Sequence, residues 1–273
     1  MVILGIDPAW TPRGPSGVAL LARKQEEGQW RCVGLAPSYD SFLALAEGKP
    51  VDWRTKPTAG VPPEPRHLLE VASLLAAEEQ ITLVTIDMPI ATVPFDSRRK
   101  ADNLCSSKFG SQGCAVHSPS KDRPGTLGTE LSEGFVKAGF SIATAAIVPR
   151  SSRCLVEVYP HPAVLVLLGE DYRIPYKCSN SRKYWPDVGT GQRVRNFLRV
   201  YSRIHGALQR VILETSLDLP EPDEVPSLAY LKRYEDVLDA LVCGWIGIEY
   251  LAGNAMPYGD QTAAIWVPKS LSV

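Results

Sequence analysis

The chain has 273 residues, of which 45% are hydrophobic and 22% are charged, and its formal net charge is −1. These values are ordinary for a soluble globular protein and exclude a global attraction to nucleic acid or membranes, so any such preference must be local. The six cysteines form no C-x-x-C pair, which predicts reduced thiols in a cytoplasmic protein. We expect no signal peptide and no membrane span, because a strand begins at once and no apolar stretch reaches the ~18 residues that a span needs.

The first predicted element is a short buried strand over residues 2–6, which is β-branched at three of its five positions. It ends at Asp7-Pro8. An ionised carboxylate at the end of a buried strand is costly unless something compensates it, and a metal ion is one such partner. A second apolar run over residues 18–22 predicts a hairpin with Asp7 at its open end.

A strand over residues 81–86 repeats this pattern, because it ends at Asp87 and is followed by Pro89. It comes after an amphipathic helix over residues 64–77, and a helix followed by a strand is typical of a parallel α/β sheet. If the two strands are parallel neighbours, Asp7 and Asp87 lie at the same edge of the sheet. Residues 92–125 are predicted to be irregular or lid-like. We predict further helices over 39–46, 127–138, 163–168, 192–213 and 234–251, and further strands over 29–35, 154–159 and 264–267.

Charge is distributed unevenly in the last third of the chain. Residues 171–210 contain nine Lys or Arg and two acids, whereas residues 214–239 contain eight acids and two basic residues. In the second segment Asp236 and Asp239 are three positions apart on a predicted helix, so both project from one face. Two adjacent acids at the start of an apolar helix repel each other unless a cation lies between them.

Together, Asp7, Asp87, Asp236 and Asp239 are four carboxylates that the predicted topology can bring together. Such hard oxygen ligands suit Mg²⁺ or Mn²⁺, and two such ions activate a water and stabilise the leaving oxygen of a phosphodiester. Each residue also has an ordinary explanation, since Asp is common in turns and is favoured near helix N-termini. The combination carries the prediction.

The order of these motifs resembles the RNase H-like superfamily in its RuvC-like branch, and more narrowly an uncharacterised family of predicted RNase H-like nucleases. The likeness runs from Val2 to Pro268. The motifs are Gly5-Ile-Asp7, Thr85-Ile-Asp87-Met-Pro89, Arg99-x-x-Asp102, Glu157-Val-Tyr-Pro160-His-Pro, Asp236-Val-Leu-Asp239-Ala-Leu and Ile265-Trp-Val-Pro268.

This resemblance implies an α/β protein with an RNase H-like fold: a mixed five-stranded sheet with flanking helices, in one domain over residues 1–273 with a basic insertion around 171–210. It also implies a metal-dependent nuclease in which Asp7, Asp87, Asp236 and Asp239 hold the metals. RuvC-like resolvases usually have Glu at the second position, where this chain has the shorter Asp87.

Five further residues are candidates for the same site. Glu157 is either a fifth metal ligand or a structural partner of Arg99 or Arg153. Arg99 is a candidate for substrate binding, although its spacing to Asp102 also fits a helix ion pair. His161 could bind substrate or act as a general acid, or it could be an ordinary surface group. Lys183 and Arg193 belong to the basic segment, which suits either phosphate binding or a solvated helix face.

Two other classes of function remain open. Actin-like ATPases and sugar kinases share this sheet and the first-strand Asp, but they need a Gly-rich phosphate loop and a second similar domain. A catalytically silent module that binds nucleic acid or protein would keep the fold without the reaction. The sequence indicates neither the nucleic-acid substrate nor the oligomeric state.

Overall fold

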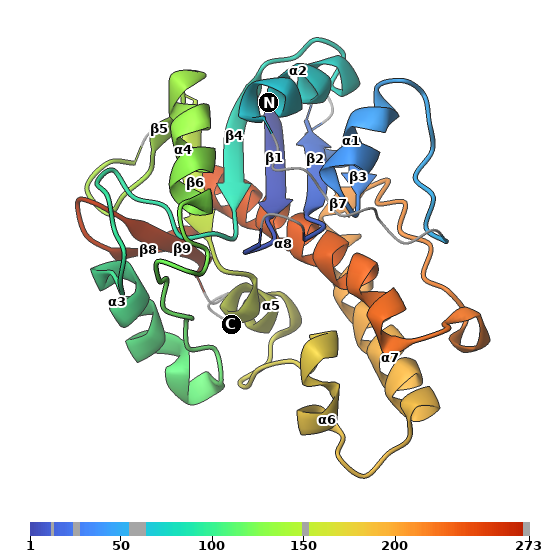
Figure 1. Ribbon diagram of the computed structural model, residues 1–273. Coiled ribbons are helices and arrows are strands. Elements are labelled where there is room, and N and C mark those ends of the chain that lie inside the picture. Colours follow the sequence, from blue (N-terminus) through green and yellow to red (C-terminus); the bar gives the residue numbers. More distant parts are fainter. Residues whose placement is uncertain (12–13, 24–27, 55–63, 149–152, 270–273) are drawn as a thin grey trace.

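The central feature of the computed structural model is a mixed β-sheet of nine strands (Figure 1). The structure describes residues 1–11, 14–23, 28–54, 64–148 and 153–269. The expected five strands are therefore too few for the described part of the chain, because two-residue strands and a C-terminal hairpin extend the sheet. The strands are β1 (Val2–Asp7), β2 (Gly17–Ala22), β3 (Trp30–Ala36), β4 (Ile81–Ile86), β5 (Ser141–Ile142), β6 (Cys154–Val158), β7 (Ile212–Leu213), β8 (Ala255–Gly259) and β9 (Ala264–Pro268).

The strand order is β7-β3-β2-β1-β4-β6-β9-β8, with β5 also paired to β6. The predicted hairpin is confirmed, since β1 and β2 are antiparallel. The predicted parallel pairing of β1 with β4 is also confirmed. The C-terminal ends of these two central strands therefore meet at one edge of the sheet, as the sequence predicted.

Helices cover both faces of the sheet (Figure 1). They are α1 (Tyr39–Leu45), α2 (Pro65–Leu75), α3 (Lys100–Phe109), α4 (Leu127–Lys137), α5 (Pro160–Leu168), α6 (Ser181–Tyr184), α7 (Thr190–Leu208) and α8 (Lys232–Ala252). One apolar core packs the sheet against α1, α2 and α4. A larger core lies on the other face and includes α3, α5, α7 and α8.

Helix α3 lies inside residues 92–125, for which we expected an irregular or lid-like segment, so the expectation of irregular structure is wrong for residues 100–109. Asp102 accepts a hydrogen bond from the backbone N–H of Arg99 and closes a capping box at the start of the helix. Ala101, Cys105 and Phe109 recur every four residues and are buried. This sparse apolar stripe among basic and polar residues was the missed signal.

The basic segment is built into the larger core. The periodicity predicted for residues 192–213 is that of α7, which ends at Leu208 before β7 continues the chain. Val194, Leu198 and Tyr201 are buried on one face of this helix, which packs against α5 and α8. In the described ranges no helix combines the length and apolar character that crossing a membrane requires.

Helix α8 lies unusually close to the central strands because glycines face it. A Cβ placed on Gly5 would be 2.5 Å from the carbonyl oxygen of Ala240, and one placed on Gly17 would be 2.1 Å from that of Asp236. Real Cβ atoms do not come this close, so only glycine allows the observed packing. The start of α8 is thereby held against the ends of β1 and β2.

Candidate metal site

Asp7 and Asp87 lie side by side at the ends of β1 and β4. The backbone N–H of Asp87 donates to the carbonyl of Ile6 at 3.1 Å, which continues the parallel pairing by one step. Gly5 faces α8, and Thr85 faces Gly247 of α8. Since side chains two positions apart in a strand point the same way, Asp7 and Asp87 both face α8.

The third element of the site is the N-terminal part of α8. Gly17 pairs with Asp7 in the β1–β2 ladder and lies against the carbonyl of Asp236, so the packing brings Asp236 next to Asp7. Asp239 is one turn further along the helix and is fully buried. The four predicted aspartates therefore converge from three elements, and α8 adds Glu235 to them.

The acids of this cluster perturb one another. Burial raises the pKa of Asp7 well above its usual range, and the charges of Asp239, Asp236 and Asp87 raise it further. Burial also raises the pKa of Asp87 to about 7, although the Lys177 ammonium opposes this. Burial is the largest cause of both shifts, and the neighbouring acids add to it.

Two lysines compensate part of the charge. The Lys177 ammonium binds Asp239 and lies 3.6 Å from Glu235, while Lys232 binds Asp236 and lies 3.1 Å from Glu235. Burial opposes ionisation of Glu235, but the two lysines outweigh it and hold the pKa of Glu235 below its usual range. Five carboxylates thus face two ammonium groups.

Sequence reasoning missed Lys177, Lys232, Glu235 and Tyr176, whose hydroxyl donates to Asp239 at 2.8 Å. The spacing of Lys232 to Asp236 on one helix was a usable signal, because it is the i, i+4 spacing of a helix ion pair. Lys177 and Tyr176 come from the loop after α5, and no local pattern connects that loop to α8.

The cluster retains carboxylate oxygens without a protein partner. The Asp7 and Asp87 side chains are only half-buried, and in the described ranges neither has a hydrogen bond or ion pair. Asp236 is buried, and its Oδ2 has no hydrogen-bond partner among the described residues. Those residues contain no group of three His, Cys, Asp or Glu side chains already arranged around a metal position. The unpartnered oxygens nevertheless have the donor chemistry that suits Mg²⁺ or Mn²⁺.

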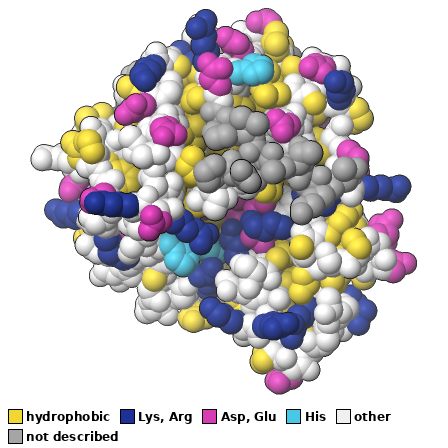
Figure 2. All heavy atoms as spheres, in the orientation of Figure 1, with side chains coloured by type: hydrophobic (Ala, Val, Ile, Leu, Met, Phe, Trp, Pro, Cys, Tyr) yellow, Lys and Arg dark blue, Asp and Glu magenta, His cyan; other side chains and the backbone are white. Residues whose placement is uncertain are grey.

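The surface over this region has both signs of charge. Figure 2 shows Lys or Arg and acidic side chains next to each other near the centre of the face, with histidine beside them. In Figure 1 the same place lies where the ends of β1 and β4 meet α5 and α8. More basic side chains gather below, over the part of the molecule that contains α6.

Arg99 and Glu157 form a separate cluster. The Arg99 guanidinium donates to Glu157 at 2.6 and 2.7 Å, to Asp102 at 2.7 and 3.2 Å, and to the carbonyl of Ile90 at 2.6 Å. All three charged side chains are buried. Every N–H of the guanidinium is therefore used, which leaves Arg99 no donor for a substrate.

The register of β6 explains why Glu157 is apart from the aspartates. Glu157 is level with Ile86, and Ile86 packs into the core on the α2 side of the sheet. Side chains that are level in neighbouring strands share a face, so Glu157 points away from α8. Of the two alternatives left by the sequence, the structure favours the structural pair with Arg99.

His161 lies in the first turn of α5. Its Nε2 is 2.7 Å from an Arg173 nitrogen, and because arginine only donates, Nε2 is the acceptor and Nδ1 carries the proton. Burial and the nearby charges of Lys177 and Arg173 hold the pKa of His161 well below its usual range. The ring is therefore neutral near pH 7. Whether it binds substrate remains a prediction.

The two remaining candidates differ. Arg193 donates to the carbonyls of Trp185 at 3.0 Å and Pro186 at 3.1 Å, so it fixes the loop between α6 and α7. Lys183 is exposed on α6. Only Lys183 of this pair presents its charge to solvent for a ligand.

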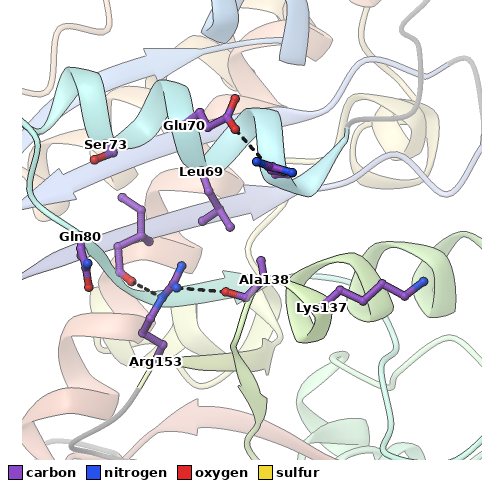
Figure 3. A pocket seen from close by; sticks show the side chains of 9 residues that line it. Leu69, Glu70, Ser73, Gln80, Lys137, Ala138 and Arg153 are labelled. Atoms are coloured by element: carbon purple, nitrogen blue, oxygen red, sulfur yellow. Dashed lines mark hydrogen bonds and ion pairs between the residues drawn. The ribbon is translucent and has the colours of Figure 1, made fainter.

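A pocket of about 430 Å³ lies at the opposite end of the sheet (Figure 3). Its wall includes Ile81, the first residue of β4, whereas Asp87 follows the last. Arg153 crosses the pocket wall and donates to the carbonyls of Ala138 at 3.0 Å and Ile81 at 3.3 Å. Arg153 thus ties α4 to the sheet, does not pair with Glu157, and takes no part in the aspartate cluster.

The fold and the cluster define an α/β protein with an acidic site at the C-terminal ends of its central strands. The chain belongs to the family described as "Protein of unknown function (DUF429)", whose model matches residues 5–263. No match was found among curated proteins or among solved structures.

Proposed function

We propose that the chain is a divalent-metal-dependent hydrolase that cleaves phosphodiester bonds of nucleic acid. The observation that carries the proposal is that Asp7 and Asp87 end adjacent parallel strands, are half-buried and have no partner among the described residues, while the buried Oδ2 of Asp236, at the start of α8, also has none there. Metal-dependent phosphoryl chemistry needs carboxylates in this state, fixed by rigid elements and still reachable from solvent.

The resemblance of the motif order to RNase H-like nucleases supports the same function. In this proposal the segment β3-β2-β1-β4-β6 corresponds to the five-stranded RNase H-like sheet, and the outer strands are additions to it. The first-strand acid is then Asp7, the acid of the next parallel strand is Asp87, and the helix acids are Asp236 and Asp239.

The residues of the site would have three different roles. Asp7, Asp87 and Asp236 would hold Mg²⁺ or Mn²⁺, which supplies Lewis-acid activation of water and of a phosphoryl oxygen. Lys177 and Lys232 keep the cluster from accumulating the full charge of five acids. The exposed charge of Lys183, with its neighbours on α6, would attract the phosphate backbone toward the site.

Replacement of one ligand tests the proposal. Asp7→Asn should abolish Mn²⁺-dependent cleavage of labelled single-stranded DNA, duplex DNA and RNA, because the amide removes a charge from the metal position. The matched control is Asp171→Asn, an exposed acid outside the cluster, which should cleave as the wild type does. Equal cleavage by Asp7→Asn would contradict the site. A wild type that binds Mn²⁺ and cleaves none of these substrates would favour the silent binding module.

A further inference from the structure

The two halves of the aspartate cluster differ in how their oxygens are used. Both oxygens of Asp239 are occupied, one by the Tyr176 hydroxyl and the other by the Lys177 ammonium, and the residue is fully buried. Asp7 and Asp87 have no such partners in the described ranges and are only partly buried. A cation from solution therefore meets free oxygens on only one side of the cluster.

Lys177 is held firmly in its place. The backbone N–H of Cys178 donates to Glu235 at 2.7 Å, and the carbonyl of Tyr176 accepts from the Tyr201 hydroxyl at 3.1 Å. The residues on both sides of Lys177 are thus tied to buried groups of α7 and α8. The Lys177 ammonium itself binds Asp239 and lies 3.6 Å from Glu235. The ammonium is a fixed positive charge at Asp239.

The side of the cluster formed by Asp7, Asp87 and Asp236 has the carboxylate oxygens to coordinate one ion. Oδ2 of Asp236 is a buried acceptor with no hydrogen bond from any residue that the structure describes, and a buried carboxylate oxygen in that state is costly unless a ligand supplies the missing partner. Asp236 adjoins Asp7 through the contact of its carbonyl with Gly17. Its other oxygen is held by Lys232.

We propose that the site takes a single divalent cation, held by Asp7, Asp87 and Oδ2 of Asp236, and that Lys177 occupies the Asp239 side in place of a second metal. The two-metal arrangement expected from the sequence is thereby replaced by one metal and one ammonium group. This inference rests on the proposed function only for the presence of a divalent cation.

Mn²⁺ binding to the whole chain, without any nucleic acid, tests the proposal. Calorimetric titration of the metal-free wild type should give one site, and electron paramagnetic resonance should show an isolated Mn²⁺ ion. Asp87→Asn should weaken binding by more than about 100-fold, because changes even in the groups that support a ligand cost 10–100-fold. Asp239→Asn should leave the affinity within a few-fold, because Asp239 is not a ligand in this arrangement.

Lys177→Met should release Asp239 and admit a second ion, which would appear as two sites and a spin-coupled Mn²⁺ pair. Lys177→Arg keeps the charge and should still bind one ion. The wild-type and Asp239→Asn results stand even if Lys177→Met fails to fold.

Two Mn²⁺ ions in the wild type, or loss of binding in Asp239→Asn, would overturn the single-cation site and leave the hydrolase proposal intact. One ion in a wild type that cleaves no nucleic acid would overturn only the hydrolase proposal. A wild type without Mn²⁺ binding would overturn both.

Discussion

Two clusters of buried charge lie near each other in this molecule, and they are built in opposite ways. In the Arg99 cluster, one guanidinium faces Glu157 and Asp102, and all four carboxylate oxygens accept a hydrogen bond. In the aspartate cluster, two lysines face five carboxylates, and Asp7, Asp87 and Oδ2 of Asp236 are left without a partner among the described residues.

The difference separates a cluster that the protein itself satisfies from one whose oxygens lack partners among the described residues. A buried charge that is completely hydrogen-bonded contributes to a unique fold, whereas one that is incompletely paired needs another explanation, such as a bound water or ion or a catalytic role. Acid count alone does not distinguish the two. The distinction depends on which oxygens the protein itself satisfies.

Removal of the cation from the structural cluster should have the largest effect on stability. Arg99→Ala leaves Glu157 and Asp102 buried without their counter-ion, so we expect the free energy of unfolding to fall by about 3–5 kcal/mol. Urea unfolding followed by circular dichroism measures the change. Arg66→Ala is the matched control, because Arg66 forms an exposed pair with Glu70 and such pairs contribute about 0–1 kcal/mol. Similar losses in the two variants would contradict the comparison.

The sequence predicted the aspartate cluster better than the Arg99 cluster. Asp7 and Asp87 follow apolar strands, and the parallel pairing inferred from the helix between them was enough to bring them together. Asp236 and Asp239 followed from helical spacing. The side on which Glu157 lies depends instead on its register with Ile86, and register is a property of the assembled sheet.

Long-range contacts account for the other differences. Lys177 reaches Asp239 across 62 positions of the chain, and Arg99 reaches Glu157 across 58. No local pattern encodes such pairs, because they form only when the loop after α5 and the start of α3 pack against the sheet. The short strands β5 and β7 have two residues each, too few for an alternating pattern to be read.

The close approach of α8 to the hairpin provides the second prediction, which concerns the aspartate cluster. Gly17→Ala places a methyl group against the Asp236 carbonyl, so the helix must shift, and we expect a loss of about 1–3 kcal/mol in the free energy of unfolding. The shift should also weaken Mn²⁺ binding, because it separates Asp236 from Asp7. Thermal unfolding and calorimetric titration measure the two effects.

Gly206→Ala is the control for this change. Gly206 lies in α7 and has open space around it, so alanine should stabilise the helix by about 0.5–1 kcal/mol and leave Mn²⁺ binding unchanged. If Gly17→Ala behaved in the same way, α8 would not need glycine for its approach, and the packing argument for the site would fail.

The last prediction has the smallest expected effect. It concerns the free energy of unfolding, which should rise for a variant of the aspartate cluster and fall for a variant of the Arg99 cluster. In metal-free buffer at pH 8, Asp7→Asn removes one charge from a cluster with more acids than lysines, so we expect the free energy of unfolding to rise by about 0.5–2 kcal/mol. Glu157→Gln also replaces a carboxylate by an amide, but in the Arg99 cluster. Because this change weakens hydrogen bonds to a charged group, it should lower the free energy of unfolding by about 1.5–3 kcal/mol. Urea unfolding of the two variants side by side measures both. A loss of stability in Asp7→Asn would mean that Asp7 is satisfied by the protein itself, and the aspartate cluster would then be structural in the same sense as Arg99, Asp102 and Glu157.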